Sequence, residues 1–132
     1  MDKALPYLCF MSPQSLYTFS NQTIGEAEFE ASIIFDHTHE IFNGHFPEQP
    51  VVPGVCLIRI VKDMAGFITG GNVVFKHGSN IKFLNIIDPN QHTEVFLKGS
   101  FLYTNENKLV IKASLSKTEV VFFKFKGTFE LS

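Results

Sequence analysis

Residues 55–69 form the segment that most constrains this chain, because they carry a helical pattern that is apolar on almost every side. The polar or small members recur at i, i+3, i+4 and i+7, which places them on one narrow stripe of a helix. They are Arg59, Lys62, Asp63 and Gly66. Pro53 suits the first position of a helix because its missing N–H is not needed there, and Gly70-Gly71 ends the segment. The pattern predicts a central helix that is buried on most sides.

The segments around this helix have the period of two that is typical of half-buried strands. In residues 24–35, alternate positions from Ala27 to Phe35 are apolar and their neighbours are mostly polar. After the helix, strands are expected over residues 72–75, 80–87, 93–103, 108–116 and 120–131. The first twenty residues are interpreted as an irregular lead-in with room for one short helix or strand. A strand, a buried helix and a run of antiparallel strands predict one α+β domain, residues 1–132, whose sheet wraps around the helix.

Charge and composition exclude several classes of protein. Eleven Lys and Arg against thirteen Asp and Glu give a net charge of -2, so no basic footprint for nucleic acid is present. Charged residues interrupt the longest apolar run, and the first residues lack the apolar length of a signal peptide, so no membrane segment is expected. Cys9 and Cys56 fit neither a disulfide framework nor a zinc motif, and Cys56 is interpreted as a buried, inert thiol. We expect a cytoplasmic protein without a metal or another cofactor.

Three histidines, His37, His39 and His45, precede the predicted helix. Histidine exchanges a proton near neutral pH, and the free N–H groups of a helix N-terminus at Pro53-Gly54 suit a carbonyl oxygen that gains negative charge. A base and such donors, close together in the sequence, predict a site for proton abstraction next to a carbonyl. The alternatives are histidines with structural or solvent-exposed roles, and a zinc site for which no fourth ligand has convincing spacing.

Residues 42–55 read FNGHFPEQPVVPGV. Gly-His-Phe-Pro followed by Pro-Val-x-Pro-Gly-Val resembles the signature of the 3-hydroxyacyl-[acyl-carrier-protein] dehydratases of fatty-acid synthesis. The resemblance extends more weakly to residues 81–83 and to the closing strands. It implies a hot-dog fold, in which an antiparallel sheet wraps around one long central helix. It also implies dimers at minimum, with active sites at the subunit interface, and a substrate that is carried on acyl carrier protein.

The resemblance also implies roles for individual residues. His45 would abstract the α proton of the 3-hydroxyacyl thioester, and the backbone N–H of Gly54 would polarise the thioester carbonyl. Phe46, Pro53 and Val55, which surround these two groups in the sequence, are expected to contact the substrate.

The resemblance breaks at Arg59. Dehydratases of this family have a Glu or Asp at this position of the helix, contributed by the partner subunit, which helps to expel the hydroxyl as water. Arginine cannot be the general acid near neutral pH because its pKa lies above about 12. Asp63, one helical turn later, is the candidate acid, with Arg59 pairing to it at i,i+4 and counted among the substrate-binding residues. Simple charge neutralisation on a mostly buried helix is the alternative.

Three functions therefore stay open. The leading one is a dehydratase-like enzyme that removes water from 3-hydroxyacyl chains on acyl carrier protein to give the trans-2-enoyl thioester, in fatty-acid or polyketide-type synthesis, with His45 and Asp63 as catalytic residues. The second is a non-catalytic or half-catalytic subunit that pairs with a complete dehydratase in a mixed dimer. The third is an acyl thioesterase. A homodimer or higher oligomer, or such a heterodimer, is expected.

The chain has 15 Phe and no Trp, which is more apolar surface than one small core requires. Phe42 and Phe46 lie in or beside the histidine loop, and Phe67 and Phe83 lie on or near the predicted helix. We expect part of this surplus to line an acyl tunnel and a dimer interface.

Overall fold

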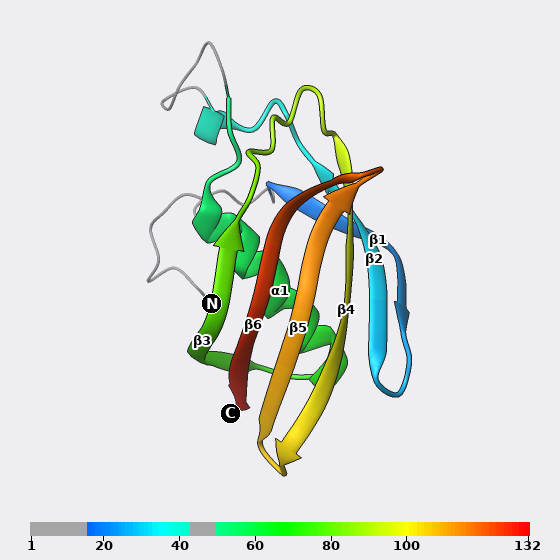
Figure 1. Cartoon of the computed structure of the whole chain (residues 1–132), viewed down its shortest axis with the longest axis vertical. Coiled ribbons are helices and arrows are strands. Elements are labelled where there is room, and N and C mark those ends of the chain that lie inside the picture. Colours follow the sequence, from blue (N-terminus) through cyan, green and yellow to red (C-terminus); the bar gives the residue numbers. More distant parts are fainter. Residues whose placement is uncertain (1–15, 43–49) are drawn as a thin grey trace.

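The computed structural model describes residues 16–42 and 50–132. Six strands and two helices follow one another along the chain (Figure 1). They are β1 (Tyr17–Ile24), β2 (Glu28–Phe35), a short 3-10 helix (Glu40–Phe42), α1 (Gly54–Thr69), β3 (Val73–Phe83), β4 (Glu94–Asn105), β5 (Lys108–Lys117) and β6 (Val120–Leu131). The strands form one sheet in the order β1-β2-β4-β5-β6-β3, and every neighbouring pair is antiparallel.

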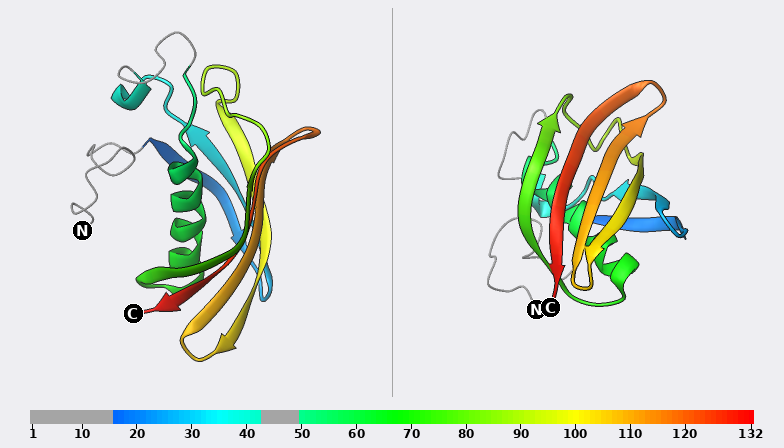
Figure 2. Two further views of the ribbon diagram at one scale, coloured as in Figure 1. Left: turned by 60° about the vertical axis from the view of Figure 1, so that its left-hand side comes forward. Right: turned by 60° about the horizontal axis from the view of Figure 1, so that its bottom comes forward.

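The sheet curves around one side of α1, as the left view of Figure 2 shows most clearly. Strand residues alternate between the two faces of a sheet, so one face turns its apolar side chains toward the helix. Ile33, Leu97 and Phe129 from this face, and Ile60 and Met64 from the helix, are fully buried. The α+β architecture expected from the sequence is confirmed, and it is the hot-dog fold.

The helix begins and ends within one residue of the predicted positions. Pro53 is the N-cap with extended backbone angles, and Gly54 is the first helical residue. At the other end Gly70 adopts the left-handed conformation, with φ of 77°, and donates its N–H to the carbonyl of Gly66 at 2.8 Å. Val55 and Phe67 are about half exposed, so the side of the helix that faces away from the sheet keeps apolar side chains in contact with solvent.

Two elements differ from the sequence prediction. Residues 17–24 form β1, although the sequence pattern places residues 17–20 in the lead-in, and β1 pairs with β2 from Tyr17 opposite Phe35 to Ile24 opposite Phe29. Residues 73–83, expected as two strands, form the single strand β3. The register of β3 against β6 shifts at two places, around positions 76 and 79, because a bulge inserts an extra residue without ending the pairing.

Cys56 is buried in the helix, as predicted. It is disulfide-bonded, however, so the interpretation as a free thiol is wrong. The other cysteine of the chain, Cys9, lies outside the described residues. None of the helices in the described ranges is long and apolar enough to cross a membrane.

Candidate functional site

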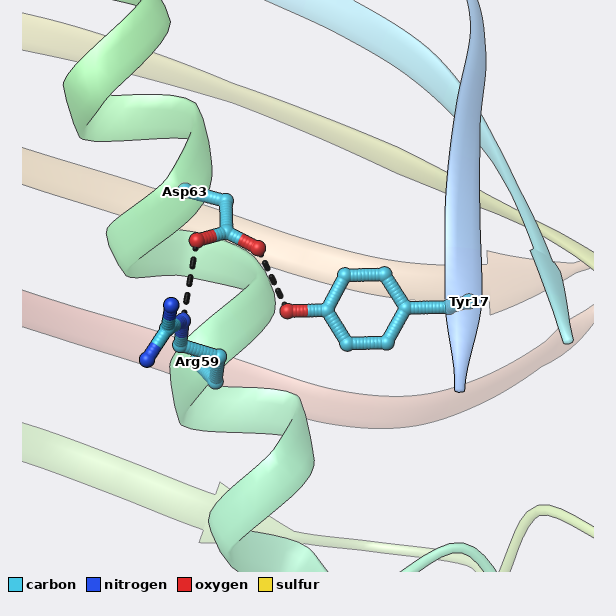
Figure 3. A network of polar contacts seen from close by, with 3 residues as sticks. All are labelled: Tyr17, Arg59 and Asp63. Carbon is cyan, nitrogen blue, oxygen red and sulfur yellow. Dashed lines mark hydrogen bonds and ion pairs between the residues drawn. The ribbon is translucent and has the colours of Figure 1, made fainter. Parts of the chain in front are cut away.

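A polar network joins β1 to the middle of α1 (Figure 3). The Arg59 Nε donates a hydrogen bond to the Asp63 Oδ1 at 3.0 Å, and these groups also form an ion pair. The Tyr17 hydroxyl donates a hydrogen bond to the Asp63 Oδ2 at 2.5 Å. The pairing of Arg59 with Asp63, expected from their spacing on the helix, is therefore confirmed, and Tyr17 is an additional partner.

Tyr17 reaches this network because β1 packs beside the helix. Its side chain is 8% exposed, and its ring makes edge contacts with Phe19 and Phe35, with ring centroids 6.1 and 6.5 Å away. Burial raises the pKa of the Tyr17 phenol well above its usual value, and the negative charge and the hydrogen bond of Asp63 raise that pKa further. The neighbouring Arg59 acts in the opposite direction on the same pKa. Tyr17 therefore stays a proton donor at physiological pH.

Asp63 accepts a hydrogen bond at each of its two oxygens. These two donors orient the carboxylate and supply charge-assisted hydrogen bonds, which are stronger than neutral ones. Both oxygens are engaged by these hydrogen bonds, so Asp63 can exchange a proton with a substrate only after one of the two donors has moved away. The network therefore fixes the position of the Asp63 carboxylate. For Asp63 to act as an acid, one of the two hydrogen bonds has to break.

An open groove of about 780 Å³ runs along this part of the helix. The polar stripe predicted from the sequence forms one wall, and the segment that leads into β3 forms the other. The lining residues are Arg59, Lys62, Asp63, Gly66, Phe67, residues 70–74 and Ser132. The groove therefore places two cations and one carboxylate beside the half-exposed ring of Phe67.

The N-terminus of α1 lies close to the end of β3. A β-carbon at Gly54 would lie 2.9 Å from Cε1 of Phe83, so a glycine here lets the ring pack against the helix start. The Gly54 N–H has no acceptor within residues 16–42 and 50–132. It is therefore available to a carbonyl oxygen, as the sequence predicts, with Val55 exposed beside it.

His45 and Phe46, the two predicted site residues of the histidine loop, lie outside the described residues. Of the other two histidines, His37 is exposed and His39 is buried. The His39 Nδ1 accepts a hydrogen bond from the backbone N–H of Ile41 at 3.0 Å, which orients its ring just before the 3-10 helix. In the part of the chain that the structure describes, no group of three or more His, Cys, Asp and Glu residues could hold a metal ion.

Tyr17 is the residue of this site that sequence reasoning missed. The segment 17–20 alternates aromatic and polar residues, Tyr-Thr-Phe-Ser, which is a weak strand signal. A longer alternation would have been needed to predict the strand. No local pattern predicts the contact with Asp63, because the two residues are 46 positions apart in the chain.

The raised pKa of Tyr17 predicts a loss of stability at alkaline pH. Below about pH 10, the pKa of an unfolded tyrosine, the protonated phenol makes its full contribution to the free energy of unfolding. Above that pH the free energy of unfolding falls by about 1.4 kcal/mol per pH unit, because only the folded state still holds the proton. We expect Tyr17→Phe to remove this component from the free energy of unfolding. Urea unfolding between pH 8 and pH 11 measures it, with Tyr103→Phe, which changes a half-exposed tyrosine, as the control. Parallel pH profiles for the wild type and both variants would contradict the assignment.

These features define a class before any relative is considered: a hot-dog protein with a polar network on its central helix and free N–H groups at the start of that helix. A model of the ApeI-like family, described as ApeI dehydratase, matches residues 21–125 of the chain. The chain belongs to this family of dehydratases.

Curated relatives agree with this assignment. The 3-hydroxyacyl-[acyl-carrier-protein] dehydratase FabZ of Cupriavidus taiwanensis is 32% identical over 97 residues, which are 73% of this chain and 56% of the relative. FabZ of Brucella ovis is 34% identical over 88 residues, which are 61% of this chain and 50% of the relative. The chain therefore spans about half the length of the curated relatives it matches.

Solved structures share the fold. The dehydratase heterocomplex ApeI:P from Xenorhabdus doucetiae superposes with a TM-score of 0.68 and 22% identity, covering 86% of this chain and 97% of that one. A mutant thioesterase from Pseudomonas aeruginosa superposes with a TM-score of 0.61 and 12% identity, covering 87% and 80% of the two chains. At these identities the likeness concerns the fold alone, which dehydratases and thioesterases have in common.

Proposed function

We propose that this protein is a hydro-lyase that removes water from 3-hydroxyacyl thioesters carried on acyl carrier protein, giving the trans-2-enoyl thioester in fatty-acid or polyketide-type synthesis. The observation that carries the proposal is the match of residues 21–125 to a dehydratase family, together with an intact histidine loop that leads into an open helix N-terminus. The curated relatives, whose printed name is that of this activity, support the substrate class.

In this proposal His45 is the base that takes the α proton, and the Gly54 N–H stabilises the negative charge that develops on the thioester oxygen. Phe46, Pro53 and Val55 line the acyl chain and the thioester. The free Gly54 N–H and the half-exposed Val55 side chain at the helix start suit these roles.

The acid that protonates the leaving hydroxyl is Asp63, the carboxylate on the polar stripe of α1 nearest to the position of Arg59. Arg59 holds this carboxylate and adds a positive charge to the groove in which the acyl thioester would lie. Water supplies the proton to Asp63 after the Tyr17 hydroxyl has turned away from Oδ2. Asp63 then gives this proton to the hydroxyl, which leaves as water, while His45 holds the α proton.

The chain exposes an apolar surface of the kind expected if its active sites lie between two subunits. Among the described strands, β3 lies at the edge of the sheet, because its one neighbour is β6. Several apolar side chains around β3 and the uncovered side of the helix are about half exposed, a combination that marks an interaction surface. They are Val55, Phe67, Val74, Phe83, Leu84 and Ile86. We propose that a second hot-dog subunit covers them.

A second candidate is a half-catalytic subunit of a mixed dimer. Its support is that both oxygens of Asp63 are engaged by Tyr17 and Arg59 of the same chain. In that case the second hot-dog subunit supplies the acid. The fold shared with a protein described as a dehydratase heterocomplex is consistent with such pairing.

The experiment that tests the proposal follows enoyl thioester formation from a 3-hydroxyacyl carrier protein, with free fatty acid measured in the same samples. We expect enoyl product from the purified protein alone. Product that appears only after addition of a second dehydratase subunit would support the mixed dimer. Free acid in place of enoyl product would show a thioesterase and refute the proposal.

Asp63→Asn tests the assignment of the acid. We expect it to lower turnover by about 10²–10⁴-fold, the usual range for losing a general acid, because the amide keeps the shape of the side chain and cannot donate the required proton. Lys62→Gln, a change of the next residue on the same polar stripe, is the control that should keep turnover. Undiminished turnover of Asp63→Asn would show that Asp63 is not the acid and that the Arg59–Asp63 pair serves to stabilise the helix.

A further inference from the structure

Five lysines cluster on the face of the sheet that points away from α1. They are Lys82, Lys98, Lys112, Lys124 and Lys126, all of them exposed, and they are called the lysine face below. Their strand neighbours, such as Leu97, Ile111 and Phe125, are buried toward the helix. Because side chains alternate along a strand, the lysines therefore project from the opposite side, which faces the viewer in Figure 1.

The lysine face concentrates charge in a chain that is acidic overall. It holds five of the eleven Lys and Arg residues of a protein whose net charge is -2. Lys112 lies directly opposite Lys126 on the neighbouring strand, and Lys82 lies directly opposite Lys124. Like charges in directly opposite positions destabilise a sheet. The same sheet also places unlike charges opposite each other, as in Lys108 with Glu130 and, at the edge of the lysine face, Lys98 with Glu30.

Four of these lysines surround a hollow of about 650 Å³. Ser100, Ala113 and Ser114 also line it, and Glu28 is the one carboxylate in its described lining. Within the described residues, the ion pairs are Arg59–Asp63 and Lys76–Glu130, and neither involves a lysine of the lysine face. The ammonium groups around the hollow are therefore available to negative charges from another molecule.

We propose that the lysine face binds the acidic surface of a protein partner, which under the proposed function is the acyl carrier protein that brings the substrate. The charges are complementary, and the lysines are spread over four strands, which suits several separate carboxylates. No arginine lines the hollow, so the paired donors that favour a phosphate group are absent from its described lining. A second copy of this face would be repelled, so the lysine face does not pair with itself.

The test compares two substrates with the same 3-hydroxyacyl group, one carried on acyl carrier protein and one on pantetheine alone. The variant is the double change Lys112→Gln and Lys126→Gln, and the control is Lys108→Gln, on the same strand but opposite Glu130. For the double variant we expect KM with the carrier-protein substrate to rise about tenfold, with kcat and the KM for the pantetheine substrate unchanged. Its Tm should not fall, because the change removes a like-charge pair.

Direct binding separates a failure of this proposal from a failure of the proposed function. Carrier protein with a fluorescent label should bind the wild type more weakly as salt rises, and the double variant about tenfold more weakly than the wild type at low salt. This binding measurement stays informative even if neither substrate is turned over. Such a lack of turnover would refute the proposed function but not the lysine face as a docking surface. Unchanged binding and KM in the double variant would overturn the lysine face as a docking surface. An effect of the double variant only on binding to vesicles with anionic lipid would overturn it as well, in favour of a membrane.

Discussion

His45→Ala is expected to lower turnover of a 3-hydroxyacyl carrier-protein substrate by about 10²–10⁴-fold, the contribution that a positioned general base makes to proton transfer. Under the proposed function no other group of the chain replaces it. His37 is exposed, and the ring of His39 is held by the backbone of Ile41. The loss should appear in kcat, because the proton is transferred in the chemical step. It is measured as the rate of enoyl product formation at saturating substrate.

His37→Ala is the matched control for this prediction, since it removes an exposed imidazole from the same region of the chain. It should keep full turnover and an unchanged Tm. A pH profile adds a second readout, because the wild-type rate should fall as pH drops below about 6.5, where an ordinary histidine becomes protonated. A His45→Ala enzyme with full turnover would refute the role of this residue and, with it, the mechanism taken from the dehydratases.

Gly99→Ala is expected to destabilise the fold by about 3 kcal/mol, a large share of the roughly 5–15 kcal/mol that stabilises a typical domain. Gly99 lies on β4 between β2 and β5, opposite Phe29 and Ala113. A β-carbon there would overlap the backbone carbonyl oxygen of Lys112 and would lie 2.6 Å from Cζ of Phe29. A ring can rotate away, but the backbone of a central strand cannot move without losing hydrogen bonds to its neighbours. Urea unfolding measures the loss.

Gly71→Ala is the control for this change, because a β-carbon at Gly71 meets no atom within 4 Å and its backbone does not need a positive φ. It should leave the free energy of unfolding unchanged or raise it slightly, since alanine restricts the unfolded chain more than glycine does. Equal stability of Gly99→Ala and Gly71→Ala would show that the sheet relaxes around position 99 at no cost.

The apolar surface of the molecule has two separate parts with different consequences. Seven of the 15 phenylalanines are buried core residues, and four of them, Phe122, Phe123, Phe125 and Phe129, lie on β6. Phe67 and Phe83, in contrast, are about half exposed, as a subunit interface requires. Much of the apolar surplus inferred from composition is therefore core, and the exposed phenylalanines among the described residues are Phe67 on the helix, Phe83 on β3 and Phe96 on β4.

Features that depend on neighbouring residues could be predicted from the sequence. The bounds of α1 follow from Pro53 and Gly70, and the inward faces of β2 and β6 follow from alternation. The pairing of Arg59 with Asp63 follows from a separation of four residues on a helix. Each of these signals lies within one or two turns of the chain, where the backbone geometry is set by local sterics and hydrogen bonds.

The strand β1 and the bulges of β3 could not be predicted in this way. β1 is mostly exposed and carries few apolar residues, so its pairing with β2 rather than its own pattern makes it a strand. Gly78 and Ser79 are typical turn residues, but β6 supplies hydrogen bonds along the whole of β3 and holds them in the sheet. In both cases the partner strand decided the conformation.

The sequence by itself determined the class of this protein, because the histidine loop and the proline-glycine helix start are contiguous and their chemistry depends on short-range geometry. Through its resemblance to the dehydratases, it also predicts that Arg59 stands where they carry an acid. Only the tertiary structure brought the Tyr17 hydroxyl to Asp63 across 46 positions and gathered lysines from four strands on one face of the sheet. Such contacts arise from strand order and register, which depend on how the whole sheet buries its apolar side against the helix and not on any single segment.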